Sequence, residues 1–344
     1  MGYLWASESL WSNVLIGALA LALLIKSADE VVKRLVGLAE YFDLSTTFMG
    51  MTVVSLATSI PEISAHLTAS VGILTGTLDY EQSSAIVLGA NIGSDVVQQT
   101  LILGLVVFFA GGLYFRRYFL LKSLLPMIGT TLMCLILGWN QVYSRLDGLI
   151  LFGTFFAYTY YLYRDERKFY QRSETVETDP QSVPQSRREA QKYALIALGA
   201  MALTVLSANV VLHVTEFVVE NTGIAGSLIG VVTLGIASAL PELMTAISGI
   251  RKKEHGISLG TLIGSNITNP LVAIGGGALL STYWVPRPLI HWDLPWETIS
   301  GAILLGMLWF RKGRLGKAGA IYLMFLYFVY LIGRALLFPT DFYY

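Results

Sequence analysis

The stretch GMTVVSLATSIPE at residues 50–62 recurs, without a gap, as GVVTLGIASALPE at residues 230–242. Each copy ends in a proline and a glutamate inside an otherwise apolar segment. Charged groups are costly in the interior of a membrane and by default mark a path for ions or substrates. A broken apolar helix at matching places in two halves of a chain is a sequence signature of a transporter binding site. The repeat therefore predicts a membrane protein built from two related halves.

The composition supports this class. The 344 residues are 54% hydrophobic and 13% charged, with a mean hydropathy of +0.62, which excludes an ordinary soluble domain and implies a lipid bilayer as solvent. The net charge of zero gives no reason to expect nucleic acid as a partner. Cys134 is the single cysteine and is expected to be a buried small hydrophobe. We find no nucleophile with a base partner and no metal-protease spacing, so we expect neither an enzyme nor a resident cofactor.

The apolar runs predict an all-α polytopic membrane protein, since a spanning helix needs about 20 mostly apolar residues. The predicted spans of the first half are 12–40, 47–75, 83–111, 117–139 and 145–164. Those of the second half are 193–221, 227–250, 257–281, 296–311 and 318–338.

Basic residues predict the orientation, because cytoplasmic loops are enriched in Lys and Arg. They gather in alternate loops, and the opposite loops hold only Arg145 and Arg287. Both termini should therefore face outward, with the polar linker 165–192 in the cytoplasm as a flexible connector. The short loops favour the plasma membrane of a prokaryote. We expect no cleavable signal peptide. The oligomeric state stays open, and a monomer would suffice.

The number of predicted helices indicates that the two repeats are inverted relative to each other. The chain divides into a first repeat at 1–164, the linker 165–192 and a second repeat at 193–344, with five helices in each repeat. Because five is odd, the second repeat must enter the membrane with opposite polarity. The repeated motifs extend over 48–100 and 228–272, where LGANIGSD at 88–95 matches LGTLIGSN at 259–266. Inverted repeats place their binding site near the midplane, between the two halves.

The residues around the two breaks predict a site made only of oxygen atoms, which suits Ca²⁺ or Na⁺. Proline lacks a backbone donor and so frees carbonyl groups near each break. Carbonyls and hydroxyls of the broken helices join the carboxylates, and hydroxyls and amides of the facing helices complete the set. The candidate ligands are Glu62, Glu242, Thr58, Ser238, Ser59, Ser94, Ser265, Ser55, Gly235, Gln98 and Asn269. Asp95 follows Ser94 by one residue, so we expect it to point away from this face and to hydrogen-bond locally.

Charge links this site to exchange. Two ionised glutamates are neutralised by one Ca²⁺, two Na⁺ or two protons. An empty, doubly charged site is costly in a low-dielectric interior. Loaded forms should therefore reorient and the empty form should not, which favours obligate exchange.

These residues resemble the cation/calcium exchanger superfamily, specifically its Na⁺/Ca²⁺ exchanger membrane-region family. The resemblance lies in ATSIPE at 57–62 with GSD at 93–95, and ASALPE at 237–242 with GSN at 264–266. It implies a ten-helix antiporter that works by alternating access, in which segments 12–40 and 193–221 slide against the rest. It also implies that Glu62 and Glu242 bind Ca²⁺ with the carbonyls of Thr58 and Ser238. The hydroxyls of Thr58, Ser59, Ser94, Ser238 and Ser265, and the carbonyls of Ser55 and Gly235, are then implied to line Na⁺ sites.

Three positions depart from the family pattern. Ala239 stands where Na⁺-coupled members usually have Ser, Asn269 where some have an acid, and Gln98 where Asn is common. The leading prediction is exchange of Ca²⁺ for Na⁺. Exchange of Ca²⁺, or another divalent cation, for H⁺ is the alternative within the same class. A cation channel is the alternative from another class, although two broken helices that meet at one acidic centre favour a carrier.

Overall fold

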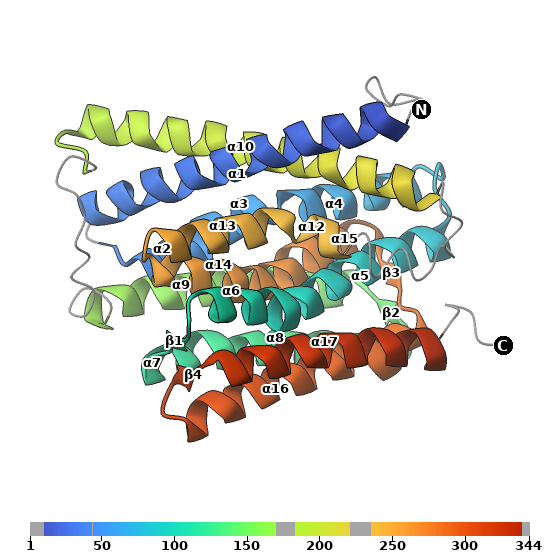
Figure 1. Ribbon diagram of the computed structural model, residues 1–344. Helices are drawn as coiled ribbons and strands as arrows, with labels where there is room; N and C mark the ends of the chain where they lie inside the picture. The colour runs from blue at the N-terminus through green and yellow to red at the C-terminus, as the bar shows by residue number, and fades with distance from the viewer. Residues whose placement is uncertain (1–9, 43, 170–182, 221–234, 339–344) are drawn as a thin grey trace.

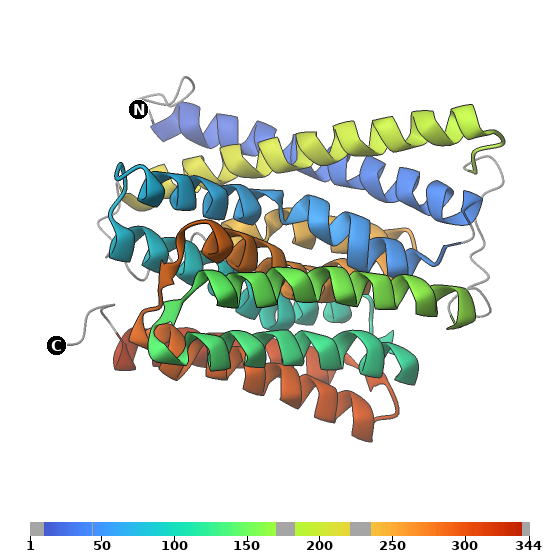
Figure 2. The same ribbon diagram turned by 180° about the vertical axis from the view of Figure 1, so that it is seen from behind.

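The computed structural model describes residues 10–42, 44–169, 183–220 and 235–338. Long helices run side by side through this part of the chain (Figure 1, Figure 2). Along one edge α1 (Leu10–Tyr41) packs against α10 (Arg187–Glu220). At the opposite edge lie α16 (Leu294–Phe310) and α17 (Lys317–Leu337). Between the edges runs α14 (His255–Thr268), whose residues from Ile257 onward are all buried.

Helices that the sequence predicts as single spans are divided by short π-helical or irregular turns. The other elements of the first half are α2 (Thr46–Met49), η1 (Gly50–Val54), α3 (Ser55–Thr58), α4 (Ile60–Leu74), α5 (Tyr80–Val97), η2 (Gln98–Ile102), α6 (Leu103–Phe109), β1 (Leu113–Tyr114), α7 (Arg117–Phe119), η3 (Leu120–Leu124), α8 (Leu125–Leu137), η4 (Gly138–Asn140), β2 (Val142–Tyr143) and α9 (Arg145–Phe169). Those of the second half are α12 (Gly235–Ser238), α13 (Leu240–Arg251), η7 (Asn269–Ile274), α15 (Gly275–Ser281), β3 (Tyr283–Trp284), η8 (Leu289–Asp293) and β4 (Arg314–Leu315).

Two short strand pairs confirm that the halves are inverted. β1 lies between the third and fourth helical segments of the first half and pairs antiparallel with β4, which lies between the fourth and fifth of the second. β2 and β3 pair in the reciprocal way. The two pairs lie at opposite ends of the bundle (Figure 1). A loop between third and fourth helices can meet a loop between fourth and fifth helices at one end only if the halves run in opposite directions.

Within the described residues each predicted span coincides with helical structure, but several predicted boundaries are wrong. The linker 165–192 is shorter than predicted, because α9 continues to Phe169 and α10 begins at Arg187. The span predicted at 296–311 is preceded by η8, which begins at Leu289. Residues 227–234 of the span predicted at 227–250 lie outside the described residues. By length and composition, four helices of the described part could cross a membrane, or five with the bent pair around residue 59. The count of ten crossings therefore stays a prediction.

The outer surface of the bundle is apolar. Large hydrophobic side chains stay exposed along the outer helices, among them Leu19, Phe156, Phe310, Phe325 and Phe328. Such a surface is costly in water and favourable against lipid tails.

A buried ion pair ties α17 to η8. Arg334 Nε lies 3.2 Å from Asp293 Oδ2, and the hydroxyl of Tyr330 donates to Asp293 Oδ1 at 2.6 Å. Both charged side chains are almost fully buried, at 6% and 1% exposure for Arg334 and Asp293. Each charge therefore depends on the other for its stabilisation.

Replacing Arg334 with Met should destabilise the protein by about 3–5 kcal/mol, because it leaves a buried carboxylate without its cation. Thermal unfolding in detergent measures this as a lower Tm. In the control Asp293→Asn/Arg334→Met both charges are absent, and most of the lost stability should return. Equal Tm values for Arg334→Met and the unchanged protein would show that the pair is not needed.

Candidate cation site

The two glutamates lie directly after equivalent breaks in the two halves. α3 ends at Thr58 and α4 begins at Ile60, so that Ser59 joins them with φ −79° and ψ 4°. Ala239 joins α12 to α13 with nearly the same angles, φ −83° and ψ 2°. The first break bends the chain by 44°. Each glutamate thus lies in the first turn of a helix, where backbone N–H groups favour a negative charge.

The prolines explain which carbonyl each break releases. Pro61 cannot donate to the carbonyl of Ala57, four residues earlier, and Pro241 cannot donate to that of Ala237. The sequence prediction named the neighbouring carbonyls of Ser55, Thr58, Gly235 and Ser238, and these stay candidate ligands. The Ser55 carbonyl accepts from the backbone N–H of Ser59 at 3.0 Å, and the Gly235 carbonyl accepts from the Ser238 hydroxyl at 3.4 Å.

The carboxylates of Glu62 and Glu242 are buried and close enough for their charges to interact. On the facing helices, Ser94 Oγ donates to Glu62 Oε1 at 3.3 Å, and Ser265 Oγ donates to Glu242 Oε1 at 3.4 Å. The breaks also cross over, since Ser238 lies beside Glu62 and Thr58 lies beside Glu242. The two halves thus form one centre, with hydroxyls of both repeats close to each carboxylate.

Several oxygens at this centre are buried without a hydrogen-bond partner. They are Ser59 Oγ, Glu62 Oε2, Glu242 Oε2 and Asn269 Oδ1. Buried polar atoms without partners are costly, and in native proteins such atoms commonly bind a water molecule or an ion or have a catalytic role. All four are oxygen atoms, the ligand type that hard cations select. In the described part of the chain, His, Cys, Asp and Glu side chains form no group of three or more that could hold a metal ion by themselves. A cation here therefore depends on hydroxyl and amide oxygens besides the two carboxylates.

Glycines allow the helices to approach closely around the centre. A Cβ atom on Gly264 would lie 2.8 Å from the backbone of Met51 and 2.8 Å from Ser55 Cβ. In the other half, a Cβ on Gly235 would lie 3.0 Å from the backbone of Gly93. These contacts hold the α14 and α5 serines against the broken helices. Ser55 itself donates to the Met51 carbonyl at 2.7 Å, with Thr268 Oγ1 at 3.3 Å.

Asp95 differs from its expected local role. Its Oδ1 accepts a hydrogen bond from Asn269 Nδ2 of the other half at 2.7 Å, so its partner lies far away in the sequence. Sequence reasoning missed this contact and also Asn266, which bonds to Gln98 across the repeats at 3.1 Å. The LGANIGSD and LGTLIGSN motifs place these residues at matching positions. Their spacing within one half cannot reveal a partner in the other.

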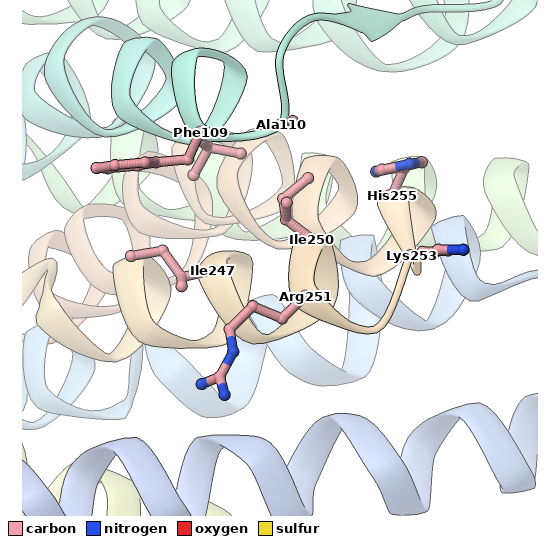
Figure 3. A pocket seen from close by; sticks show the side chains of 8 residues that line it. Phe109, Ala110, Ile247, Ile250, Arg251, Lys253 and His255 are labelled. Atoms are coloured by element: carbon pink, nitrogen blue, oxygen red, sulfur yellow. The ribbon is translucent and has the colours of Figure 1, made fainter.

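A separate cavity of about 480 Å³ lies at one end of the bundle (Figure 3). Phe109 of α6 and Ala110 directly after it line one side, and Ile247 and Ile250 of α13 line another. Its remaining labelled side chains are Arg251, Lys253 and His255. Because neither glutamate of the cation site lines it, this cavity is distinct from that site.

Comparison with known families decides the relationship. The profile of the family described as sodium/calcium exchanger protein matches residues 12–164 and 192–336. The chain belongs to this family. It is an integral membrane protein and shares 28% identity with the inner membrane protein YrbG of Escherichia coli, over 76% of this chain and 78% of that one. It shares 24% with the sodium/calcium exchanger MaX1 of Methanosarcina acetivorans, over 85% and 90% of the two chains.

A solved structure supports the same fold. A structure of the sodium-calcium exchanger NCX_Mj superposes with a TM-score of 0.75 and 21% identity, covering 96% of this chain and 100% of that one. The expected all-α membrane architecture of inverted repeats is therefore confirmed.

Proposed function

We propose that this protein exchanges Ca²⁺ for Na⁺ across a membrane by alternating access at the site of Glu62 and Glu242. The observation that carries the proposal is the pair of buried carboxylates at equivalent breaks, each with an unpartnered oxygen. The relative MaX1 is named a sodium/calcium exchanger, which supports Na⁺ and Ca²⁺ as the two exchanged ions. The protein is on this reading a transporter and not an enzyme.

The charge of the centre suits a divalent cation. One Ca²⁺ balances two carboxylates, and its preferred shell of six to eight oxygens exceeds what two carboxylates supply. The neighbouring hydroxyls and the backbone carbonyls next to the two prolines are available to complete the shell. Cargo binding removes the cost of two interacting buried charges, so the loaded protein reorients more readily than the empty one.

The driving ion depends on the asymmetry at the breaks. Ser59 offers a buried, unpartnered hydroxyl, whereas its counterpart Ala239 offers none. A Na⁺ ion bound beside Ser59 therefore has no equivalent beside Ala239. This difference is the reason to keep exchange of Ca²⁺ for H⁺ as the second candidate, with protons carried by the two glutamates.

Alternating access requires a pair of helices that moves against the rest. α1 and α10 suit this role because they pack against each other along one edge of the bundle. Ser248 Oγ of α13 donates to Asp29 Oδ1 of α1 at 2.5 Å, and Arg251 lies 3.8 Å from Asp29 Oδ2. We infer that these contacts hold α1 to the remaining helices in the state described here. The proposed topology has both termini outside and the linker in the cytoplasm of a prokaryote.

Ca²⁺ flux into proteoliposomes, with Na⁺ and pH gradients imposed separately, tests the proposal. We expect Ca²⁺ uptake that follows the Na⁺ gradient at fixed pH. Uptake driven by a pH gradient alone would indicate exchange of Ca²⁺ for H⁺. Ohmic single-channel currents would indicate a channel. An absence of Ca²⁺ flux under either gradient would contradict both exchange hypotheses.

A further inference from the structure

Two hydrogen bonds cross between the repeats behind the cation site. Asn269, one turn after Ser265, donates from Nδ2 to Asp95 Oδ1 at 2.7 Å. Asn266 donates from Nδ2 to Gln98 Oε1 at 3.1 Å. In both pairs, the residue directly after the motif serine of one half meets the residue four positions after the motif serine of the other. All four side chains are buried, at 0–1% exposure.

A backbone carbonyl determines which residue donates in the hydrogen bond between Asn266 and Gln98. Asn266 Nδ2 also donates to the Leu262 carbonyl at 2.9 Å, and a carbonyl can only accept. The Asn266 atom that faces Gln98 is therefore the NH₂ group, so Gln98 must present its oxygen. The Gln98 NH₂ group then donates to Ser94 Oγ at 3.2 Å. The Gln98 amide oxygen is thus engaged by Asn266, and its nitrogen faces Ser94.

In the hydrogen bond between Asn269 and Asp95, the donor is instead the residue four positions after the motif serine. Asn269 presents its NH₂ group to Asp95 Oδ1, which accepts this bond as a carboxylate oxygen or as the carbonyl oxygen of the protonated acid. The Asn269 Oδ1 atom is consequently directed elsewhere, buried and without a partner. Asn269 and Ser265 are four residues apart and share a helix face, and Ser265 donates to Glu242. The acid at position 95 thus determines which end of the Asn269 amide is left free.

We propose that Asp95 is a positioning residue that fixes the Asn269 amide so that its oxygen serves as a cation ligand beside Glu242. Gln98, in contrast, acts as a hydrogen-bond donor that orients Ser94 and does not ligate the cation. The two related halves thus contribute unequally, with Ca²⁺ drawn toward Asn269. This inference rests on the proposed exchange of Ca²⁺ at the glutamate pair.

Substitutions at Asp95, including a swap of the Asp95 and Asn269 side chains, test the inference. Asp95→Leu removes the acceptor and should weaken Ca²⁺ binding to the purified protein by about 10–100-fold, the usual effect of losing a group that orients a metal ligand. Asp95→Asn should weaken it less, because an amide accepts but also permits Asn269 to turn over. In Asp95→Asn/Asn269→Asp the new amide donates to the new carboxylate, so the affinity should recover relative to Asp95→Asn. Isothermal titration with Ca²⁺ measures binding, and the flux assay gives KM and kcat.

A matched comparison separates ligation from packing. Asn269→Leu should raise the KM for Ca²⁺ more than Gln98→Leu does, since only the first removes a ligand oxygen. Unchanged Ca²⁺ affinity in Asp95→Leu, or a double variant no better than Asp95→Asn, would contradict the role of Asp95 while leaving the proposed exchange intact. A wild-type protein that does not bind Ca²⁺ would overturn both.

Discussion

Replacing either Glu62 or Glu242 with Gln should abolish Ca²⁺ exchange. The amide keeps the size of the side chain but removes one of two charges that balance a divalent cation. Each carboxylate has one oxygen bonded to a motif serine and one without a partner, so the unpartnered oxygen is the atom that faces the cargo. We expect a loss of at least about a hundredfold, the upper end of the effects seen when a metal site loses a supporting group.

Proteoliposome flux measures this loss, and thermal unfolding in detergent provides its control. Tm should not fall in either variant, because removing a buried charge that lacks a full set of partners relieves a cost. Glu81→Gln is a matched substitution at an exposed position of α5, and its flux should equal that of the wild type. Full transport by either site variant would remove that glutamate from the cation site.

The sequence predicted the architecture because the decisive signals are repeated. Pro61 and Pro241 each break an apolar helix one residue before a glutamate, and an odd number of helices in each half implies inversion. The structure reproduces both features, with the pairing of β1 to β4 and of β2 to β3 as independent support for inversion. The boundaries were less predictable. The span predicted at 296–311 starts too late, because proline is tolerated in a first helical turn and η8 precedes α16.

The sequence could not predict which end of the Gln98 and Asn269 side-chain amides, the oxygen or the NH₂ group, is hydrogen-bonded to the other half. Gln98 and Asn269 occupy matching positions in the two repeats, and the sequence therefore suggested the same role for both. Their difference depends on the partner that each meets in the other half, Asn266 for Gln98 and Asp95 for Asn269. The local pattern specifies which helix face a residue occupies, whereas tertiary packing decides which atom of an amide is left free.

Replacing Gly264 with Ala should impair transport nearly as strongly as loss of a glutamate. The added Cβ would lie 2.8 Å from the backbone of Met51, which cannot move aside as a side chain can. α14 must then shift away from η1 and α3, and it carries Ser265, which donates to Glu242 at 3.4 Å. Overpacking of this kind costs about 1–3 kcal/mol. A displacement of about 1 Å at a preorganised site can cost about a hundredfold in rate.

Gly89→Ala is the matched control for this substitution. Gly89 lies on α5 in the corresponding motif of the first half, and a Cβ there meets no atom within 4 Å. Alanine should therefore leave transport unchanged and raise Tm slightly, since glycine in a helix is less stable than alanine by about 0.5–1 kcal/mol. Gly264→Ala should instead lower both Tm and Ca²⁺ flux. If both variants transport like the wild type, close approach of α14 to the broken helix is not what holds the second-half serine at the cation site.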